Sequence, residues 1–486
     1  MSGGARVLAF DLGASSGRGI MGIYENGSLR VEEICRFKNE PVFSGGHLRW
    51  DFGRLLSEIR RGIDKAGSFD SLGFDTWGVD FGLLDGSGRL IEDPVHYRDG
   101  RTEGACEKVF EIIPPEELYA ATGSQIMPIN TLFQLIALKN GGGIPKNAER
   151  LLFMPDLFAY ALCGNAVCEQ TIASTSQMLD PVSKKWNRAL LEKLGLPSGL
   201  LLPTVPSGTQ VGTLKLKDGS TAKITAVAGH DTQCAVAAMP SQSENAAFLS
   251  CGTWSLIGTE LDSPVLTEKS MELGLSNEVG ADGKINYLKN IIGLWLIQEC
   301  RRCWNEQGLS IGFDGIAKEA ERAPALRCFI DPDAAEFVPP GDMPARIRDF
   351  CRRTGQYVPE TVGEISRCVY ESLALKYRFA LAQLREATGK SFSALHILGG
   401  GSNAPLLCRM TADACGIPVI AGPAEATALG NIIIQLCALG CVGNIAEGRR
   451  LVAETQPVVR YEPSPESGIA KSYERYLELL NKHNRP

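Results

Sequence analysis

The sequence predicts an α/β protein with two related halves, and three observations support this fold class. A continuous apolar run over 224–228, ended by Gly229, is typical of a strand buried on both faces of a parallel sheet. Residues 7–24 and 246–258 each have the pattern of a strand, a small polar turn and a second strand. Residues 395–398 predict a further buried strand that leads through three glycines into a helix. The repeated strand-turn-strand pattern indicates an internal repeat.

Composition limits the classes of function. A chain of 486 residues exceeds one ordinary hydrophobic core, so its length predicts about two to four domains. The hydrophobic share of 44% and charged share of 22% are those of a soluble globular protein. A net charge of -7, without a long Lys/Arg run, argues against a nucleic-acid partner. The N-terminus reaches Asp11 after a short apolar run, so we expect neither a signal peptide nor a membrane span there, and none elsewhere.

Fifteen cysteines raise the question of metal ions and disulfides. Cys163 and Cys168 form one close pair in the sequence, and Cys300 and Cys303 form another, but no partner pair stands at the spacing of a zinc finger. We therefore expect no zinc site and mostly buried thiols in a reducing cytoplasm.

The first polar turn, 11–18, follows an apolar strand. It could be an ordinary surface hairpin, because short Gly/Ser turns are common. Asp11 favours a functional turn, since an acid at the end of an apolar strand is costly to bury without a cation or hydrogen bonds. A Mg²⁺ ion held through water would satisfy Asp11 beside a turn that binds phosphate.

The next elements follow from local signals. Residues 26–27 are Asn-Gly, which predicts a hairpin turn, and 50–66 has helical periodicity. A strand interrupted by polar residues covers 72–85, where Trp77 is either core or a floor for a sugar ring. The charged loop 97–102 is either a solvated cluster of ion pairs or a substrate contact.

The central stretch places Asp231 just past the carboxyl end of a buried strand, where open α/β sheets bind ligands. Asp231 could be a helix N-cap or a general base, and the residues alone favour neither. The turn 250–253 is a tight hairpin whose backbone N–H groups can approach phosphate oxygens.

The last third of the chain predicts mainly helices. Residues 288–298 have the pattern of an apolar helix entered through Asn290, which is a good N-cap residue. A long helix is expected over 366–387. The turn 399–403 joins a buried strand to a helix N-terminus, an arrangement that binds anions and nucleotides. A dinucleotide fingerprint is not supported, because no acid follows at the expected distance.

Together these motifs resemble the FGGY family of carbohydrate kinases, whose fold belongs to the actin-like superfamily. The resemblance rests on five motifs that span nearly the whole chain: 11–18, 75–81, 97–99, 293–295 and 396–401. The series from Gly399 through Asp413 to Gly430 matches the family signature. Two positions depart from the common pattern, with Ala14 where Thr is frequent and Arg409 where Gln is frequent.

The resemblance implies two actin-like (ribonuclease H-like) domains with a cleft for ATP and sugar between them. It implies a reaction that transfers phosphate from ATP to the C1 hydroxyl of a ketose, here L-rhamnulose, in L-rhamnose catabolism, with Mg²⁺ held by Asp11 through water. Asp231 then becomes the proton acceptor. The implied ATP residues are Ala14, Ser15, Ser16, Gly17, Arg18, Thr253, Gln298, Gly399, Gly400 and Gly401, and the implied sugar residues are Trp77, Gly78, His230, Asp231, Thr232 and Asn290.

Two alternatives to this reaction stay open. The chain could phosphorylate another ketose such as L-fuculose or xylulose, because a few polar contacts separate such sugars. It could also be a non-catalytic sugar-binding protein of the actin-like superfamily, although such a protein needs no proton acceptor. We expect an N-terminal domain over 1–242, a nucleotide-binding domain over 243–455, and a C-terminal tail with a helix over 456–486. The sequence leaves the oligomeric state open, with a monomer favoured over an oligomer.

Overall fold

The chain divides into two compact units, each formed from segments that are far apart in the sequence. The computed structural model describes residues 4–483. Unit 1 comprises 1–242, 260–287 and 426–456, and unit 2 comprises 243–259, 288–425 and 457–486. The chain first passes from unit 1 to unit 2 after residue 242, and it returns to unit 1 twice after that point.

Unit 1 holds most of the strands. Its strands are β1 (Ala5–Leu12), β2 (Ser16–Glu25), β3 (Ser28–Lys38), β4 (Val42–Ser44), β5 (His47–Arg49), β6 (Ser71–Thr76), β7 (Phe81–Asp85), β8 (Ala148–Phe153), β9 (Cys168–Glu169), β10 (Leu179–Asp180), β11 (Lys185–Trp186), β12 (Thr204–Val205), β13 (Thr209–Lys215), β14 (Thr221–Ala226) and β17 (Ser276–Val279). Its helices are α1 (Phe52–Ala66), α2 (Ala105–Phe110), α3 (Pro115–Thr122), α4 (Thr131–Asn140), α5 (Met154–Cys163), α6 (Gln170–Ser174), α7 (Arg188–Lys193), α8 (Asp231–Ala237), α9 (Glu268–Glu272), α15 (Ala426–Ala438) and α16 (Ile445–Thr455).

Unit 2 holds the longest helix. Its strands are β15 (Ala246–Cys251), β19 (Ala394–Leu398), β20 (Val419–Ala421) and β21 (Val459–Tyr461), while β16 (Trp254–Leu261) and β18 (Ile285–Ile292) each cross a unit boundary in the sequence. Its helices are α10 (Trp295–Glu306), α11 (Phe313–Arg322), α12 (Met343–Arg353), α13 (Val362–Thr388), α14 (Pro405–Cys415) and α17 (Tyr473–His483).

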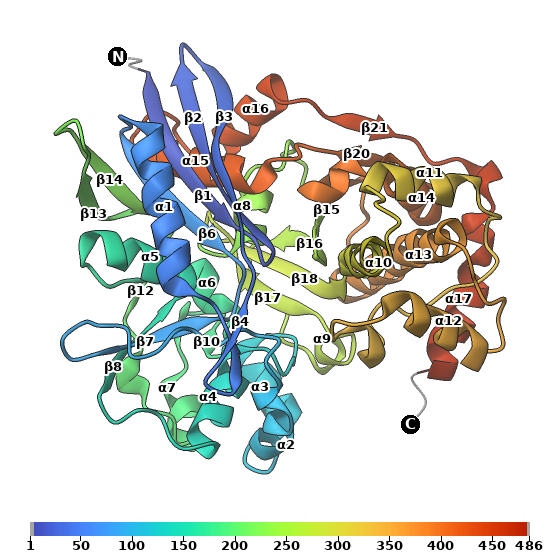
Figure 1. Cartoon of the computed structure of the whole chain (residues 1–486), viewed down its shortest axis with the longest axis horizontal. Coiled ribbons are helices and arrows are strands. Elements are labelled where there is room, and N and C mark those ends of the chain that lie inside the picture. The colour runs from blue at the N-terminus through green and yellow to red at the C-terminus, as the bar shows by residue number, and fades with distance from the viewer. Residues whose placement is uncertain (1–3, 484–486) are drawn as a thin grey trace. The chain divides into compact units, whose positions relative to one another are not determined.

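The main sheet of unit 1 has the order β13-β14-β6-β1-β2-β3. Strands β1 and β2 form an antiparallel hairpin, and β1 pairs in parallel with β6. Strand β14 extends the parallel part, and β13 closes this edge in the antiparallel direction. Figure 1 shows β1, β2 and β3 side by side. Because β1, β6 and β14 run in parallel, their carboxyl ends meet at one edge of the sheet.

The two faces of this sheet carry different residues, because side chains alternate along a strand. Phe10 and Phe74 are register partners whose rings stack 5.6 Å apart, on the face that meets Gly62 of α1. Gly73 belongs to the opposite face. A Cβ built on Gly73 would lie 2.7 Å from Oδ1 of Asn431, so only glycine lets α15 approach so closely.

The second large sheet, which contains all four strands assigned to unit 2, repeats this plan. The full order is β17-β18-β16-β15-β19-β20-β21. Strands β15 and β16 form an antiparallel hairpin, β15 pairs in parallel with β19 and β19 with β20, and β21 is antiparallel to β20. The series β16-β15-β19-β20-β21 therefore matches β2-β1-β6-β14-β13 in order and direction. The internal repeat predicted from the two strand-turn-strand patterns is confirmed.

A second core fills the rest of unit 1. It is built from buried apolar residues between Phe81 and Leu201, joined by Val279, and includes Phe133, Phe153 and Trp186. The antiparallel pair β7 and β8 leads into this core from the end of β6. Thus the Trp-Gly segment after β6 lies where the main sheet meets the second core.

One predicted element is wrong. The sequence predicts a helix over 288–298 entered through Asn290, whereas β18 continues to Ile292 and helix α10 begins only at Trp295. The strand is favoured because Ile291 and Ile292 are β-branched and buried. The backbone N–H of Ile292 donates to Asp333 Oδ1 at 2.9 Å, which fixes the end of the strand.

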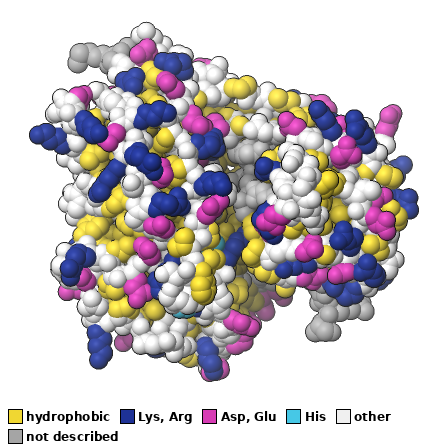
Figure 2. Space-filling view, in the orientation of Figure 1, with side chains coloured by type: hydrophobic (Ala, Val, Ile, Leu, Met, Phe, Trp, Pro, Cys, Tyr) yellow, Lys and Arg dark blue, Asp and Glu magenta, His cyan; other side chains and the backbone are white. Residues whose placement is uncertain are grey.

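Basic and acidic side chains are interspersed over the face seen in Figure 2. Within residues 4–483, every helix is too short or too polar to cross a membrane.

Candidate active site

Asp231 lies where the sequence predicts it, just past the carboxyl end of the buried strand β14. The backbone N–H of Thr76 donates to the Gly229 carbonyl at 2.8 Å, so the segment after β14 stays aligned with the end of β6. His230 is the N-cap of α8, and Asp231 is the first helical residue. The N-cap alternative for Asp231 is therefore wrong, and its carboxylate, whose side chain is 31% exposed, is available for chemistry.

A buried network holds the neighbouring imidazole of His230. Its Nδ1 lies 2.9 Å from Oε2 of Glu278 on β17, and its Nε2 lies 3.5 Å from Oδ1 of Asp231. Gln233 Nε2 donates to the same Glu278 oxygen at 2.6 Å, and Asn286 Nδ2 donates to Gln233 Oε1. The ring therefore lies between two carboxylates in a fixed orientation.

These contacts control the charges at the site. Burial alone would lower the pKa of His230, but the Glu278 carboxylate and then Asp231 raise it above its usual value. Burial raises the pKa of Asp231 to about 6, while the positive charge of His230 opposes this rise. Asp231 is therefore ionised at neutral pH and close enough to its pKa to accept a proton.

Three acids gather at the carboxyl edge of the main sheet. Asp11 pairs in register with Asp75 on β6 and with Arg18 on β2. The Arg18 guanidinium donates to one oxygen of Asp11, through Nη2 at 2.7 Å and Nε at 3.0 Å. Burial first, and then the charge of Asp11, raises the pKa of Asp75 well above its usual range, and Asp231 adds to this effect.

This arrangement suits a divalent cation that keeps its water ligands. Asp75 Oδ1 is buried without a hydrogen-bond partner. The negative charges of Asp11 and Asp231 raise the pKa of Asp75, so a positive ion at this edge would be stabilised. The ligand oxygens of the three acids do not all lie within 4.8 Å of one another, so a cation could not bind all three directly. Mg²⁺ usually keeps several waters and takes one or two carboxylates. The residues present fit such an ion.

The Trp-Gly segment is held by a further buried acid, Asp80. Asp80 Oδ2 accepts from Trp50 Nε1 at 2.7 Å and from Trp77 Nε1 at 2.9 Å. Gln134 Nε2 donates to its other oxygen at 3.1 Å. Burial raises the pKa of Asp80 to about 6 against these hydrogen bonds. Trp77 is only 6% exposed, which favours its core role over a floor for a sugar ring.

Gly78 is adjacent to this cluster and is half-buried. A Cβ built on Gly78 would lie 3.2–3.3 Å from the side chain of Thr175, so any larger residue would crowd α6 and its C-terminal end. Thr175 Oγ1 in turn accepts from the Val79 backbone at 3.1 Å. Trp77 and Gly78 therefore share a rigid support.

The predicted nucleotide residues of unit 2 lie together. Thr253 Oγ1, in the β15–β16 turn, donates to Gln298 Oε1 on α10 at 3.2 Å. A Cβ on Gly401 would lie 2.2 Å from Cys251 Sγ, so the glycine turn packs directly on the end of β15. Around Gly400 the space is open, with no atom within 4 Å of such a Cβ. The β15–β16 turn therefore contacts Gln298 through Thr253, and the strand before it contacts the glycine turn through Cys251.

The other predicted residues are placed within their own units. The turn 13–16 is closed by a hydrogen bond from Gly13 N to Ser16 O at 2.9 Å, and Asn39 binds it through two further bonds. Asn290 is half-buried on β18 and belongs to unit 2. Arg409 forms an exposed ion pair with Glu321 at 2.6 Å.

Several supporting residues were missed by the sequence analysis. Glu278 lies in a short polar segment with no contrast to its neighbours. Asn431 Nδ2 donates to Asp75 Oδ2 at 2.6 Å, and Gln435 Nε2 donates to the Leu8 carbonyl at 3.0 Å. Asn431 and Gln435 interrupt an apolar helix four residues apart, which places them on one face and was a usable signal.

The fold defines a class of protein. Over 98% of both chains, the structure resembles ligand-bound xylulose kinase from Lactobacillus acidophilus, with a TM-score of 0.79 at 17% identity. It also resembles glycerol kinase from Plasmodium falciparum with ADP, with a TM-score of 0.77 at 14% identity over 99% of this chain and 98% of that one. The chain thus has the two-domain, actin-like (ribonuclease H-like) fold of these kinases.

Sequence comparison gives the family. The N-terminal domain model of the FGGY family of carbohydrate kinases matches 7–238, and its C-terminal domain model matches 247–439. A rhamnulokinase of Bacteroides thetaiotaomicron is 43% identical over 94% of this chain and 95% of the relative. A rhamnulokinase of Pectobacterium carotovorum is 40% identical over 99% of this chain and 97% of the relative. The chain belongs to the FGGY family of carbohydrate kinases, and it is a sugar kinase that uses ATP.

Proposed function

We propose that this kinase transfers the γ-phosphoryl group of ATP to the C1 hydroxyl of L-rhamnulose, giving L-rhamnulose 1-phosphate and ADP in L-rhamnose catabolism. The observation that carries the choice of sugar is identity of about 40% to several rhamnulokinases over nearly the whole chain. The fifteen free thiols support a role in the reducing cytoplasm.

Asp231 is the proposed proton acceptor. Phosphoryl transfer asks little covalent chemistry of the protein, but it needs an in-line nucleophile and a positioned base. The sugar hydroxyl loses its proton mainly as the transition state develops, so a carboxylate with a pKa of about 6 is basic enough. Glu278 orients His230, and His230 in turn keeps Asp231 ionised at neutral pH.

The remaining roles are proposed from the resemblance of these motifs to the family. Gly78, Trp77, His230, Thr232 and Asn290 are proposed for the sugar, with Trp77 acting as a support for Gly78. The turn 14–18, Thr253, Gln298 and the glycines 399–401 are proposed for ATP. Mg²⁺, held through water near Asp11, would neutralise charge on the phosphate oxygens.

The test compares ADP release with Mg²⁺-ATP across L-rhamnulose, L-fuculose, xylulose, ribulose and glycerol at equal concentrations. L-Rhamnulose should give the highest kcat/KM. A different preferred sugar would refute the choice of substrate, and no activity with any sugar would favour a sugar-binding protein.

The same assay tests the base. Asp231→Asn should lower kcat by about 10²–10⁴-fold because it removes general-base catalysis. Its binding of L-rhamnulose, followed by calorimetry, should be retained. Asp64→Asn, at an exposed position on α1, is the matched control and should keep full activity. Full turnover by Asp231→Asn would assign the proton acceptor to another group.

A further inference from the structure

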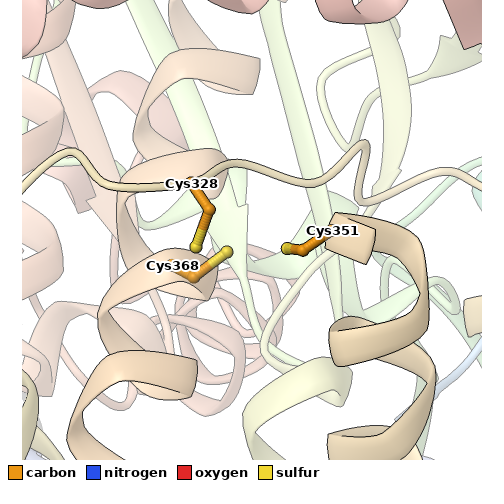
Figure 3. Close-up of side chains that lie close together, drawn as sticks. All are labelled: Cys328, Cys351 and Cys368. Atoms are coloured by element: carbon orange, nitrogen blue, oxygen red, sulfur yellow. The ribbon is translucent and has the colours of Figure 1, made fainter. Parts of the chain in front are cut away.

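Three cysteines that are distant in the sequence converge inside unit 2. Cys328 precedes the short helix at 335–337, Cys351 is on α12 and Cys368 is on α13. Their sulfur atoms all lie within 4.8 Å of one another, and each residue is at most 3% exposed. Figure 3 shows the three side chains directed toward a common point from three separate segments. All three are thiols rather than disulfides.

The backbone that carries Cys328 is fixed on both sides. The Leu326 N–H donates to Glu371 Oε2 at 2.9 Å, and the Phe329 N–H donates to Gln356 Oε1 at 2.9 Å. Gln356 Nε2 also donates to the Phe329 carbonyl at 2.8 Å. The backbone at Cys328 is therefore held in place on both sides, as that of a preformed ligand would be.

Sulfur is the ligand that thiophilic metal ions such as Zn²⁺ prefer. The three Sγ atoms lie close enough together for a single ion to contact all of them.

A fourth position is also available. A cavity of about 10 Å³ lies beside two of the three sulfurs: Cys328 and Cys368 line it together with Glu371, Arg367 and Tyr357, whereas Cys351 does not. This volume is close to the minimum that holds one water molecule. Within residues 4–483, no His, Asp or Glu joins the three sulfurs as a fourth ligand, so water is the available one. Three sulfurs and one water make a tetrahedral set for Zn²⁺.

We propose that Cys328, Cys351 and Cys368 form a zinc site with water as the fourth ligand. Binding is an exchange without oxidation: Zn²⁺ forms three Zn–S bonds, and the thiols that are still protonated release their protons to solvent. The ion would join the loop before 335–337 to α12 and α13, far in sequence from the catalytic residues. Its role is structural, because a metal that closes chain loops stabilises the folded state.

Cobalt titration tests the site directly. The full chain is purified anaerobically under reducing conditions, freed of metal with a chelator, and titrated with Co²⁺ as a spectroscopic probe. We expect thiolate-to-cobalt charge-transfer absorption that saturates at one ion per chain and disappears when one equivalent of Zn²⁺ is added. One equivalent of Zn²⁺ should also raise the thermal midpoint of the wild-type chain.

Matched variants separate this site from other thiols. Cys351→Ser should lose the absorption, whereas Cys415→Ala, which removes a buried thiol at the end of α14, should keep it. Because Cys351→Ser could destabilise unit 2, its folding is checked by circular dichroism, and Cys368→Ser provides a second variant. The proposal is overturned if wild-type protein gives no such absorption or thermal shift, if the absorption persists in a folded Cys351→Ser variant, or if mass spectrometry finds two of the three cysteines joined as a disulfide in the isolated protein.

Discussion

The two hairpins that begin the repeated sheets have the same backbone plan but different chemistry. In unit 1 the β1–β2 hairpin pairs Asp11 with Arg18 at 2.7 Å. In unit 2 the β15–β16 hairpin has neutral contacts, with Thr253 Oγ1 donating to Gln298 and Ser255 Oγ 2.8 Å from the hydroxyl of Tyr377. Each hairpin lies beside the parallel strand that ends at its site.

This difference shows how one topology supports two tasks. The charged hairpin lies with Asp75 and Asp231 at one edge of the sheet, where the base and the cation are proposed to lie. The neutral hairpin lies against a glycine turn, where close backbone approach matters more than charge. The shared strand order places a hairpin turn beside each proposed site. The side chains in the β1–β2 turn and in the β15–β16 turn then differ in what they can bind.

The largest expected effect comes from breaking the charged pair. Arg18→Met keeps an aliphatic side chain but leaves Asp11, which is 5% exposed, without its positive partner. Removing one member of a mostly buried pair should destabilise the protein by about 3 kcal/mol. The measurement is the shift in the urea midpoint followed by intrinsic fluorescence.

Arg409→Met is the control, because its partner Glu321 is exposed and such pairs contribute less than about 1 kcal/mol. If Arg18→Met and Arg409→Met lost the same amount of stability, the ion pair between Asp11 and Arg18 would contribute no more than an exposed pair. The β1–β2 hairpin would then not differ from the β15–β16 hairpin in this respect.

The sequence predicted the parts of this comparison that depend on local pattern. The apolar run before Gly229 and the two strand-turn-strand segments have strong periodicity, so the sheets, the repeat and the place of Asp231 could be predicted. The helix over 288–298 was wrong because its apolar residues suit a helix or a buried strand equally well without tertiary information.

Long-range partners could not be predicted in the same way. Glu278 contacts His230 only because β17 returns to unit 1 more than forty residues later in the chain. The three cysteines at 328, 351 and 368 have no metal-binding spacing, since their positions depend on how α12 and α13 pack. Contacts of this kind are set by the fold, and a single sequence holds no local signal for them.

The neutral hairpin can be tested through its neighbouring glycines. In Gly401→Ala the new methyl group would overlap Cys251 Sγ, which is 2.2 Å from the built position, and should lower stability by about 2 kcal/mol. Gly400→Ala meets no atom within 4 Å and should leave the thermal midpoint unchanged. Because Gly400 is proposed to face ATP, this variant should instead raise KM for ATP. Thermal melts and ATP kinetics together separate packing from binding, and a stable, fully active Gly401→Ala would show that the turn is loosely packed.

The smallest effect should come from the charge that supports Asp231. Wild-type kcat/KM should fall as the pH decreases through about 6, because protonated Asp231 cannot accept a proton. Glu278 raises the pKa of His230, and the positive His230 lowers that of Asp231. In Glu278→Gln the imidazole should lose its charge at neutral pH, so the pKa of Asp231 should rise. The acidic limb of the pH profile should then move to higher pH by about one unit, or about 1.4 kcal/mol.

Glu272→Gln, at an exposed position on α9, is the control and should leave the profile in place. A purely structural role for Glu278 predicts a lower thermal midpoint with an unmoved acidic limb, and that result would contradict the proposed coupling. A shifted acidic limb with native-like stability would show that Glu278, although remote in sequence, controls the charge of Asp231 through His230. The charged character of the site beside the β1–β2 hairpin would then extend to a residue outside that hairpin.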